Sequence, residues 1–175
     1  MSESNKIRNR SEIPAEDKWA IEDLYVSDEA WEQELDTLTG DKELLQSFAG
    51  HLSDSGEKLY DFLYATEQTN VKAKRLANYC MRKADEDTRD SHYQAMTGKF
   101  ISVAVALDAA TSFETPEIMA IEDETLNRFY AECPRLERYR RALTNLRRRK
   151  AHILSAAEEK LLASTGEMAQ APDKI

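Results

Sequence analysis

The feature that most constrains the fold of this chain is a long stretch of apolar residues at helical spacing. From Tyr93 to Ala110 the apolar positions are three or four residues apart, which places them on one face of a helix for about five turns. Shorter stripes of the same kind occur in 31–38, 44–52, 59–63, 73–84, 123–130, 136–146 and 155–162. No alternating apolar pattern of strand length is present, and the sequence has only five glycines and four prolines. We therefore expect an all-α fold, an antiparallel multi-helix bundle with short connections.

Polar and glycine residues mark the expected helix ends. Ser27, with acidic residues after it, is suited to cap a first helix, and Gly40 is suited to end it. Thr115-Pro116 indicates another helix start, and Ser155 begins a capping box before a last helix. Gly98 lies inside the longest stripe and costs about 1 kcal/mol relative to alanine. We expect close helix packing to be the reason for Gly98.

Three regions are expected along the chain. Residues 1–26 contain large apolar groups without helical spacing, and we expect an extended arm that packs on the surface through Trp19, Leu24 and Tyr25. Residues 27–165 form the helical domain, and 166–175 begin a linker to a further, catalytic domain.

Composition limits the class of protein. One third of the residues are charged, 41% are hydrophobic and the formal net charge is −9, a balance typical of a folded, soluble protein and unfavourable for general nucleic-acid binding. Cys80 and Cys133 form no metal or redox motif, so we interpret them as buried, reduced residues of a cytoplasmic protein. The longest run free of charge and of strongly polar residues, Phe100 to Leu107, is too short to span a membrane.

Catalytic and metal motifs are missing from the sequence. A zinc peptidase helix needs two histidines four residues apart with an adjacent glutamate, but the histidines are His51, His92 and His152. We interpret each as a surface or hydrogen-bonded residue. Residues 85–90 are acidic but lack the glycine and glutamate of a calcium loop, so we expect a turn that caps the next helix. No catalytic residue is predicted, no metal or other cofactor is expected on this chain, and the chain should be inactive alone.

One segment has an unusual charge. Eight basic residues against Glu137 give residues 135–150 a charge of +7, which leaves −16 for the rest of the chain. Three interpretations stay open: the cluster Arg147 to Lys150 lies at the C-terminus of its helix, the cations pair with acidic helices of the bundle or of another domain, or they bind phosphate backbones. The candidate partner-binding residues are Arg135, Arg138, Arg141, Arg147, Arg148, Arg149 and Lys150.

Four groups of motifs in order resemble one known family. Residues 10–31 contain a proline arm, the Trp19 to Tyr25 segment and the string from Ser27 to Trp31. The stretch Tyr79 to Asp90, the Phe113 to Ile118 stretch and the His152 to Glu159 stretch follow. From about residue 10 onward this order resembles the N-terminal region of oligoendopeptidase F, a zinc metallopeptidase family.

The resemblance implies a function for a larger protein. It implies a cytoplasmic metallopeptidase of peptidase family M3 that hydrolyses short peptides in a closed cavity, with zinc on an HExxH helix. None of those catalytic residues maps onto this chain. The expected partner is the catalytic domain of the same enzyme, and an apolar face exposed without it would favour homo-oligomers. The alternative is a standalone helical interaction module that binds an acidic partner or nucleic acid through residues 135–150.

Overall fold

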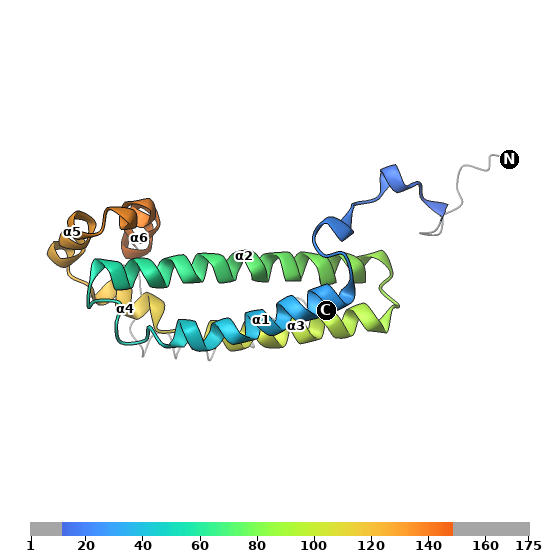
Figure 1. Cartoon of the computed structure of the whole chain (residues 1–175), viewed down its shortest axis with the longest axis horizontal. Helices are drawn as coiled ribbons and strands as arrows, with labels where there is room; N and C mark the ends of the chain where they lie inside the picture. The colour runs from blue at the N-terminus through green and yellow to red at the C-terminus, as the bar shows by residue number, and fades with distance from the viewer. Residues whose placement is uncertain (1–11, 149–175) are drawn as a thin grey trace, which may run out of the picture.

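A computed structural model describes residues 12–148, and within that range it is all-α with no strand. Three long helices run side by side, with α1 (Asp28–Gln46) and α3 (Ser91–Ala110) along one side of α2 (Gly56–Glu86) (Figure 1). Short connections make α2 antiparallel to both neighbours. The expected antiparallel helical bundle is confirmed. The helix expected at 155–162 and the linker expected at 166–175 lie outside the described residues.

Polar caps set the starts of the three helices. The hydroxyl of Ser27 accepts a hydrogen bond from the Ala30 amide at 3.2 Å, and Ser55 does the same for Lys58 at 3.1 Å. Asp90 caps α3 through the His92 amide at 2.9 Å. The acidic segment after α2 is therefore a helix-capping turn, as the sequence predicted.

The core of the bundle combines apolar stripes with two polar ties. Trp31 is fully buried and its indole NH donates to the Leu76 carbonyl at 2.9 Å, which joins α1 to α2. Asp28 accepts hydrogen bonds from Tyr79 at 2.8 Å and from His92 at 2.9 Å, which joins all three helices. Burial alone raises the pKa of Asp28, but the bonds to His92 and Tyr79 lower it below its ordinary value.

A second group of short helices covers one end of α2 (Figure 1). It contains α4 (Glu114–Ala120), α5 (Asp123–Glu132), the 3-10 helix η5 (Pro134–Tyr139) and α6 (Arg140–Arg148). The group is in close contact with α2 at Gly56. A Cβ added to Gly56 would lie 2.8 Å from the Phe129 carbonyl oxygen and 3.1 Å from Cys133 Cβ. Only glycine permits this close approach.

The prediction that Gly40 ends the first helix is wrong. Helix α1 continues through Gly40 because Leu38 and Leu45 lie on the same buried stripe, and tertiary packing outweighs the propensity of one glycine. The left-handed glycine after α1 is Gly50, with φ of 82°. A Cβ added at Gly98 would meet no atom of another described residue within 4 Å, so close packing within this part of the chain does not explain that glycine.

The N-terminal arm is anchored differently from the expectation. Residues 12–26 contain two 3-10 turns, η3 (Ala15–Asp17) and η4 (Ile21–Asp23). Trp19 is 75% exposed, whereas Ile21 is buried. Tyr25 packs edge-on against Tyr79, with ring centroids 5.6 Å apart. Leu24 and Tyr25 pack against the core as expected, together with Ile21. Trp19 does not attach the arm, because it precedes the turn that reaches the bundle.

Candidate interaction site on the basic segment

The first half of the basic segment lies against an acidic and aromatic face of α2. That face is made by residues at spacings of three and four: Glu57, Tyr60, Tyr64 and Glu67. Arg135 pairs with Glu57 and stacks over Tyr60 at 4.3 Å from the ring centroid. Arg138 pairs with Glu67 at 2.6 Å. These cations therefore join η5 to α2.

Hydrogen bonds between η5 and α2 shift the pKa values of Glu57 and Tyr139. A hydrogen bond from Cys133 and then one from Arg135 lower the pKa of Glu57. Burial, followed by the 2.6 Å hydrogen bond that Tyr139 donates to Glu67, raises the pKa of Tyr139. Glu57 is therefore ionised and Tyr139 protonated at neutral pH, the states that their hydrogen bonds require.

Arg147 lies at the other end of the segment and caps a different helix. Its guanidinium donates to the Ile118 carbonyl at 2.9 Å and to the Ile121 carbonyl, both at the C-terminal end of α4. It also pairs with Asp123 at 2.6 Å, and its side chain is only 14% exposed. A cation at a helix C-terminus is favourable: Arg147 lies in the last turn of α6, as the first interpretation expects, and its guanidinium also caps α4.

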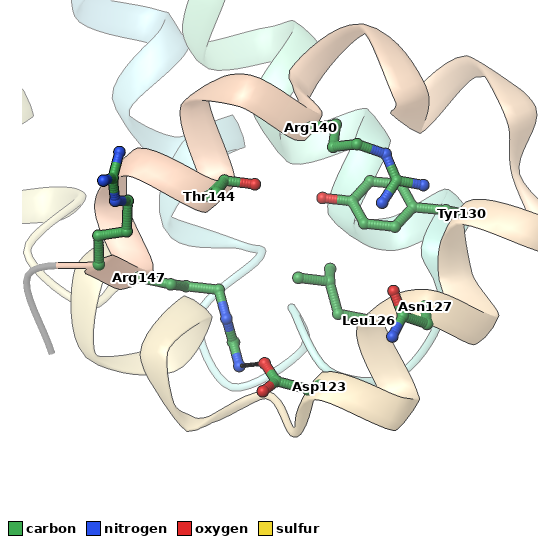
Figure 2. A pocket seen from close by; sticks show the side chains of 8 residues that line it. Asp123, Leu126, Asn127, Tyr130, Arg140, Thr144 and Arg147 are labelled. Carbon is green, nitrogen blue, oxygen red and sulfur yellow. Dashed lines mark hydrogen bonds and ion pairs between the residues drawn. The ribbon is translucent and has the colours of Figure 1, made fainter.

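A pocket of about 500 Å³ opens between α5 and α6 (Figure 2). Arg140 lies over the Tyr130 ring, 3.8 Å from its centroid, and pairs with Glu137 at 2.6 Å. The hydroxyl of Tyr130 is buried and has no hydrogen-bond partner within residues 12–148. The pocket is lined by Asp123, Leu126, Asn127, Tyr130, Arg140, Thr144, Arg147 and Arg148.

The candidate residues thus divide by their surroundings. Arg135, Arg138 and Arg147 form ion pairs inside the domain, which supports the interpretation that the basic segment pairs with acidic helices of the same bundle. Arg141 and Arg148 are exposed and form no ion pair with another described residue. Arg149 and Lys150 lie outside the described residues.

Of the eight residues that line the pocket, only Arg147 and Arg148 were among the predicted candidates, and the six that were missed include Arg140 and Tyr130. Arg140 is one of many arginines in the segment, and nothing in the sequence indicates that it stacks on Tyr130 across the turn between α5 and η5. A cation and an aromatic residue at this separation give no periodic signal.

The histidines that the structure describes are surface residues with acidic partners, as predicted. His51 contacts Asp54 at 2.8 Å and His92 contacts Asp28 at 2.9 Å. His152 lies outside the described range. Among residues 12–148 no group of three or more His, Cys, Asp or Glu side chains is arranged to hold a metal ion. In the same range no helix is both long and apolar enough to cross a membrane.

The two cysteines are buried and unpaired, which confirms the predicted burial. Burial raises the pKa of both thiols. They therefore act as small apolar residues of the core, and the exposed cationic surroundings that activate a thiol are missing at Cys80.

Comparisons with known proteins agree with this all-α domain. The sequence profile of the family described as Oligopeptidase F matches residues 117–175. The chain is 35% identical over 168 residues to Oligopeptidase PepF of Bacillus subtilis (strain 168), covering 94% of this chain and 25% of the relative. It is 33% identical over 168 residues to the plasmid oligoendopeptidase F of Lactococcus lactis subsp. cremoris, covering 95% of this chain and 28% of the relative.

Two solved structures match the fold of this chain. The crystal structure of oligoendopeptidase-F from Enterococcus faecium matches with a TM-score of 0.67 and 26% identity, over 81% of this chain and 28% of that one. A crystal structure from Chlamydophila abortus matches with a TM-score of 0.77 and 25% identity, over 94% and 28% of the two chains.

The fold and its relatives define a helical domain of a peptidase family. The chain is homologous to the N-terminal part of oligoendopeptidase F-like peptidases. It spans about a quarter of the length of the curated relatives that it matches.

Proposed function

We propose that this chain is the non-catalytic N-terminal domain of a zinc metallopeptidase that cleaves short peptides in a closed cavity. The observation that carries the proposal is similarity over nearly the whole chain to peptidases about four times as long. In this assignment the catalytic region of the same enzyme supplies the zinc ligands and the water-activating glutamate. The present domain supplies one wall of the cavity.

The outer face of α3 supports packing against another domain. Gly98, Ile101 and Val105 follow each other at spacings of three and four, so they share one helix face. Ile101 is 48% exposed and Val105 is 63% exposed, and the glycine leaves room above the backbone. A small and apolar helix face of this kind is suited to close contact with a second helix.

The ion pairs of η5 weaken the alternative of a standalone basic module. Arg135 and Arg138 are neutralised by Glu57 and Glu67 and are held against α2. A surface that binds phosphate backbones needs several unpaired cations and stacking aromatics. Buried, unpaired cysteines support a cytoplasmic location for the enzyme.

The proposal is tested with the purified chain and with the complete enzyme. We expect the 175-residue chain to bind no stoichiometric zinc and to leave a fluorogenic peptide uncleaved. The complete enzyme should contain zinc and cleave the peptide. Zinc-dependent turnover by the 175-residue chain would show that the assignment is wrong.

The docking face is tested in the complete enzyme by Val105→Glu. We expect a charge in an apolar interface to cost several kcal/mol, to open the contact between the domains and to make their linker sensitive to protease. The matched control is Val71→Glu, which changes a 53% exposed valine on α2 in the same way and should leave protease resistance unchanged. Equal behaviour of the two variants would argue against docking through α3.

A further inference from the structure

We propose that the pocket between α5 and α6 is an oxyanion-binding site that takes the carboxylate or phosphate group of a small ligand. The proposal concerns a site within this domain and is independent of whether a catalytic domain docks on α3. It rests on a buried hydroxyl without a partner in residues 12–148, on an excess of positive charge and on the volume of the pocket.

The Tyr130 hydroxyl is the first observation. Tyr130 is 8% exposed, and its oxygen has no hydrogen-bond partner among the described residues. Leaving a buried hydroxyl unsatisfied is energetically unfavourable, so such a group calls for an explanation. Figure 2 shows the oxygen directed toward the space between Arg140, Thr144 and Leu126. A ligand acceptor in that space would satisfy it.

The protonation state of the phenol suits this role. Burial raises the pKa of Tyr130, and this outweighs the lowering effect of Arg140. The hydroxyl is therefore neutral near pH 7 and acts as a hydrogen-bond donor. A neutral donor next to cations favours an oxyanion over a cation.

Electrostatics are the second observation. The lining contains Arg140, Arg147 and Arg148, against Asp123, and Glu137 pairs with Arg140 from outside the lining. The local balance is positive in a chain whose net charge is −9. Guanidinium groups bind carboxylate and phosphate through parallel hydrogen bonds.

The three arginines have different roles in the site. Arg147 donates hydrogen bonds to Asp123 and to two carbonyls at the end of α4, so it fixes the wall and contributes charge. Arg140 uses Nε for Glu137, which leaves its terminal nitrogens available, and its side chain is 46% exposed. Arg148 has no ion pair with a described residue. Arg140 and Arg148 are therefore the cationic donors, and Thr144 and Asn127 add neutral ones.

The pocket volume fits a small molecule. About 500 Å³ lies within the range of small-molecule sites, about 300–1,000 Å³. Leu126 provides an apolar wall beside the polar groups. The site therefore suits an organic acid or organic phosphate in which one end is charged.

Titration by two-dimensional amide NMR tests the proposal on the 175-residue chain. The probes are inorganic phosphate and acetate, with sodium chloride at equal ionic strength as reference. We expect saturating shifts at the Asn127 side-chain amide and at the Thr144 backbone amide. Saturation by acetate alone, by phosphate alone or by both would identify the oxyanion, and saturation by neither would overturn the proposal.

Substitutions separate specific binding from general charge effects. Tyr130→Phe keeps the ring under Arg140 and removes only the unpartnered hydroxyl, so folding is preserved while affinity falls about fivefold. Arg148→Gln removes a charged donor and should weaken binding about tenfold. The matched control is Arg128→Gln on α5, where Arg128 faces Glu132 at 3.8 Å outside the lining. A loss with Arg128→Gln equal to that with Arg148→Gln, or no loss with Tyr130→Phe, would refute the site.

Discussion

Replacing Gly56 with alanine tests whether the short helices are fixed to α2 by a close backbone contact. A Cβ at this position would lie 2.8 Å from the Phe129 carbonyl oxygen and 3.1 Å from Cys133 Cβ. The first of these neighbours is backbone within α5, so it cannot rotate away. Relief of the clash requires α5 to move away from α2.

The magnitude follows from two opposing effects. Overpacking of this kind costs about 1–3 kcal/mol, while alanine gains at most about 1 kcal/mol of helix propensity over glycine. With the full propensity gain the net loss is about 0–2 kcal/mol, which corresponds to a decrease of up to about 8 °C in melting temperature for a chain of this size.

Gly98→Ala is the matched control in the same chain. Gly98 lies inside α3 and no atom of another described residue lies within 4 Å of an added Cβ. We expect this variant to be about 1 kcal/mol more stable than the wild type, with a melting temperature about 2–4 °C higher. Urea unfolding followed by far-ultraviolet circular dichroism measures both variants.

The two variants must shift stability in opposite directions. If Gly56→Ala were as stable as Gly98→Ala, the short helices would not be held by this contact, and the structural account of the second helical group would be wrong.

Three further predictions concern charge and association. Arg147→Gln should destabilise the domain by about 2 kcal/mol in urea unfolding, because it removes charged hydrogen bonds to backbone carbonyls. Substitution of the exposed Arg141 by glutamine should change stability by less than about 0.5 kcal/mol, and equal effects of the two variants would contradict the capping role of Arg147. The pKa of Asp28 is lowered from 3.8 in the folded state, so the stabilisation by its carboxylate is complete above about pH 4 and is lost as the pH falls through the lower folded value. Asp28→Asn should therefore reduce the difference in unfolding free energy between pH 6 and pH 3, and an unchanged difference would refute this. The 175-residue chain should self-associate through Ile101 and Val105, and light scattering should show a monomer for the double glutamate variant; a monomeric wild type would contradict the prediction.

The sequence was sufficient where structure depends on local pattern. The cap at Ser27, the helix Asp123–Glu132 and the long helix of 91–110 follow from hydrogen-bonding side chains and apolar spacing, which act over a few residues. The two stripes of 59–63 and 73–84 belong to one helix, α2. The gap between them is polar, and helical continuity there comes from tertiary contacts such as the Lys72–Asp41 pair at 2.7 Å.

The candidate site was less accessible to sequence reasoning because it depends on contacts between distant residues. The sequence showed that residues 135–150 carry a positive charge. It did not show which of these cations form ion pairs inside the domain and which line the pocket. Arg147 reaches carbonyls 26 and 29 positions earlier, and a backbone acceptor leaves no mark in the sequence. The close approach at Gly56 was missed for the same reason: nothing near Gly56 in the sequence indicates that α5 packs against it.

Helix α2 also sets a fixed span between two surfaces of the molecule. With 31 residues it is about 45 Å long, and it contacts α1 and α3 along its length and α5 and η5 at one end. An unbroken helix resists bending, so a partner that binds α3 is mechanically coupled to the α5–α6 end through α2, in addition to the short connection from α3 to α4.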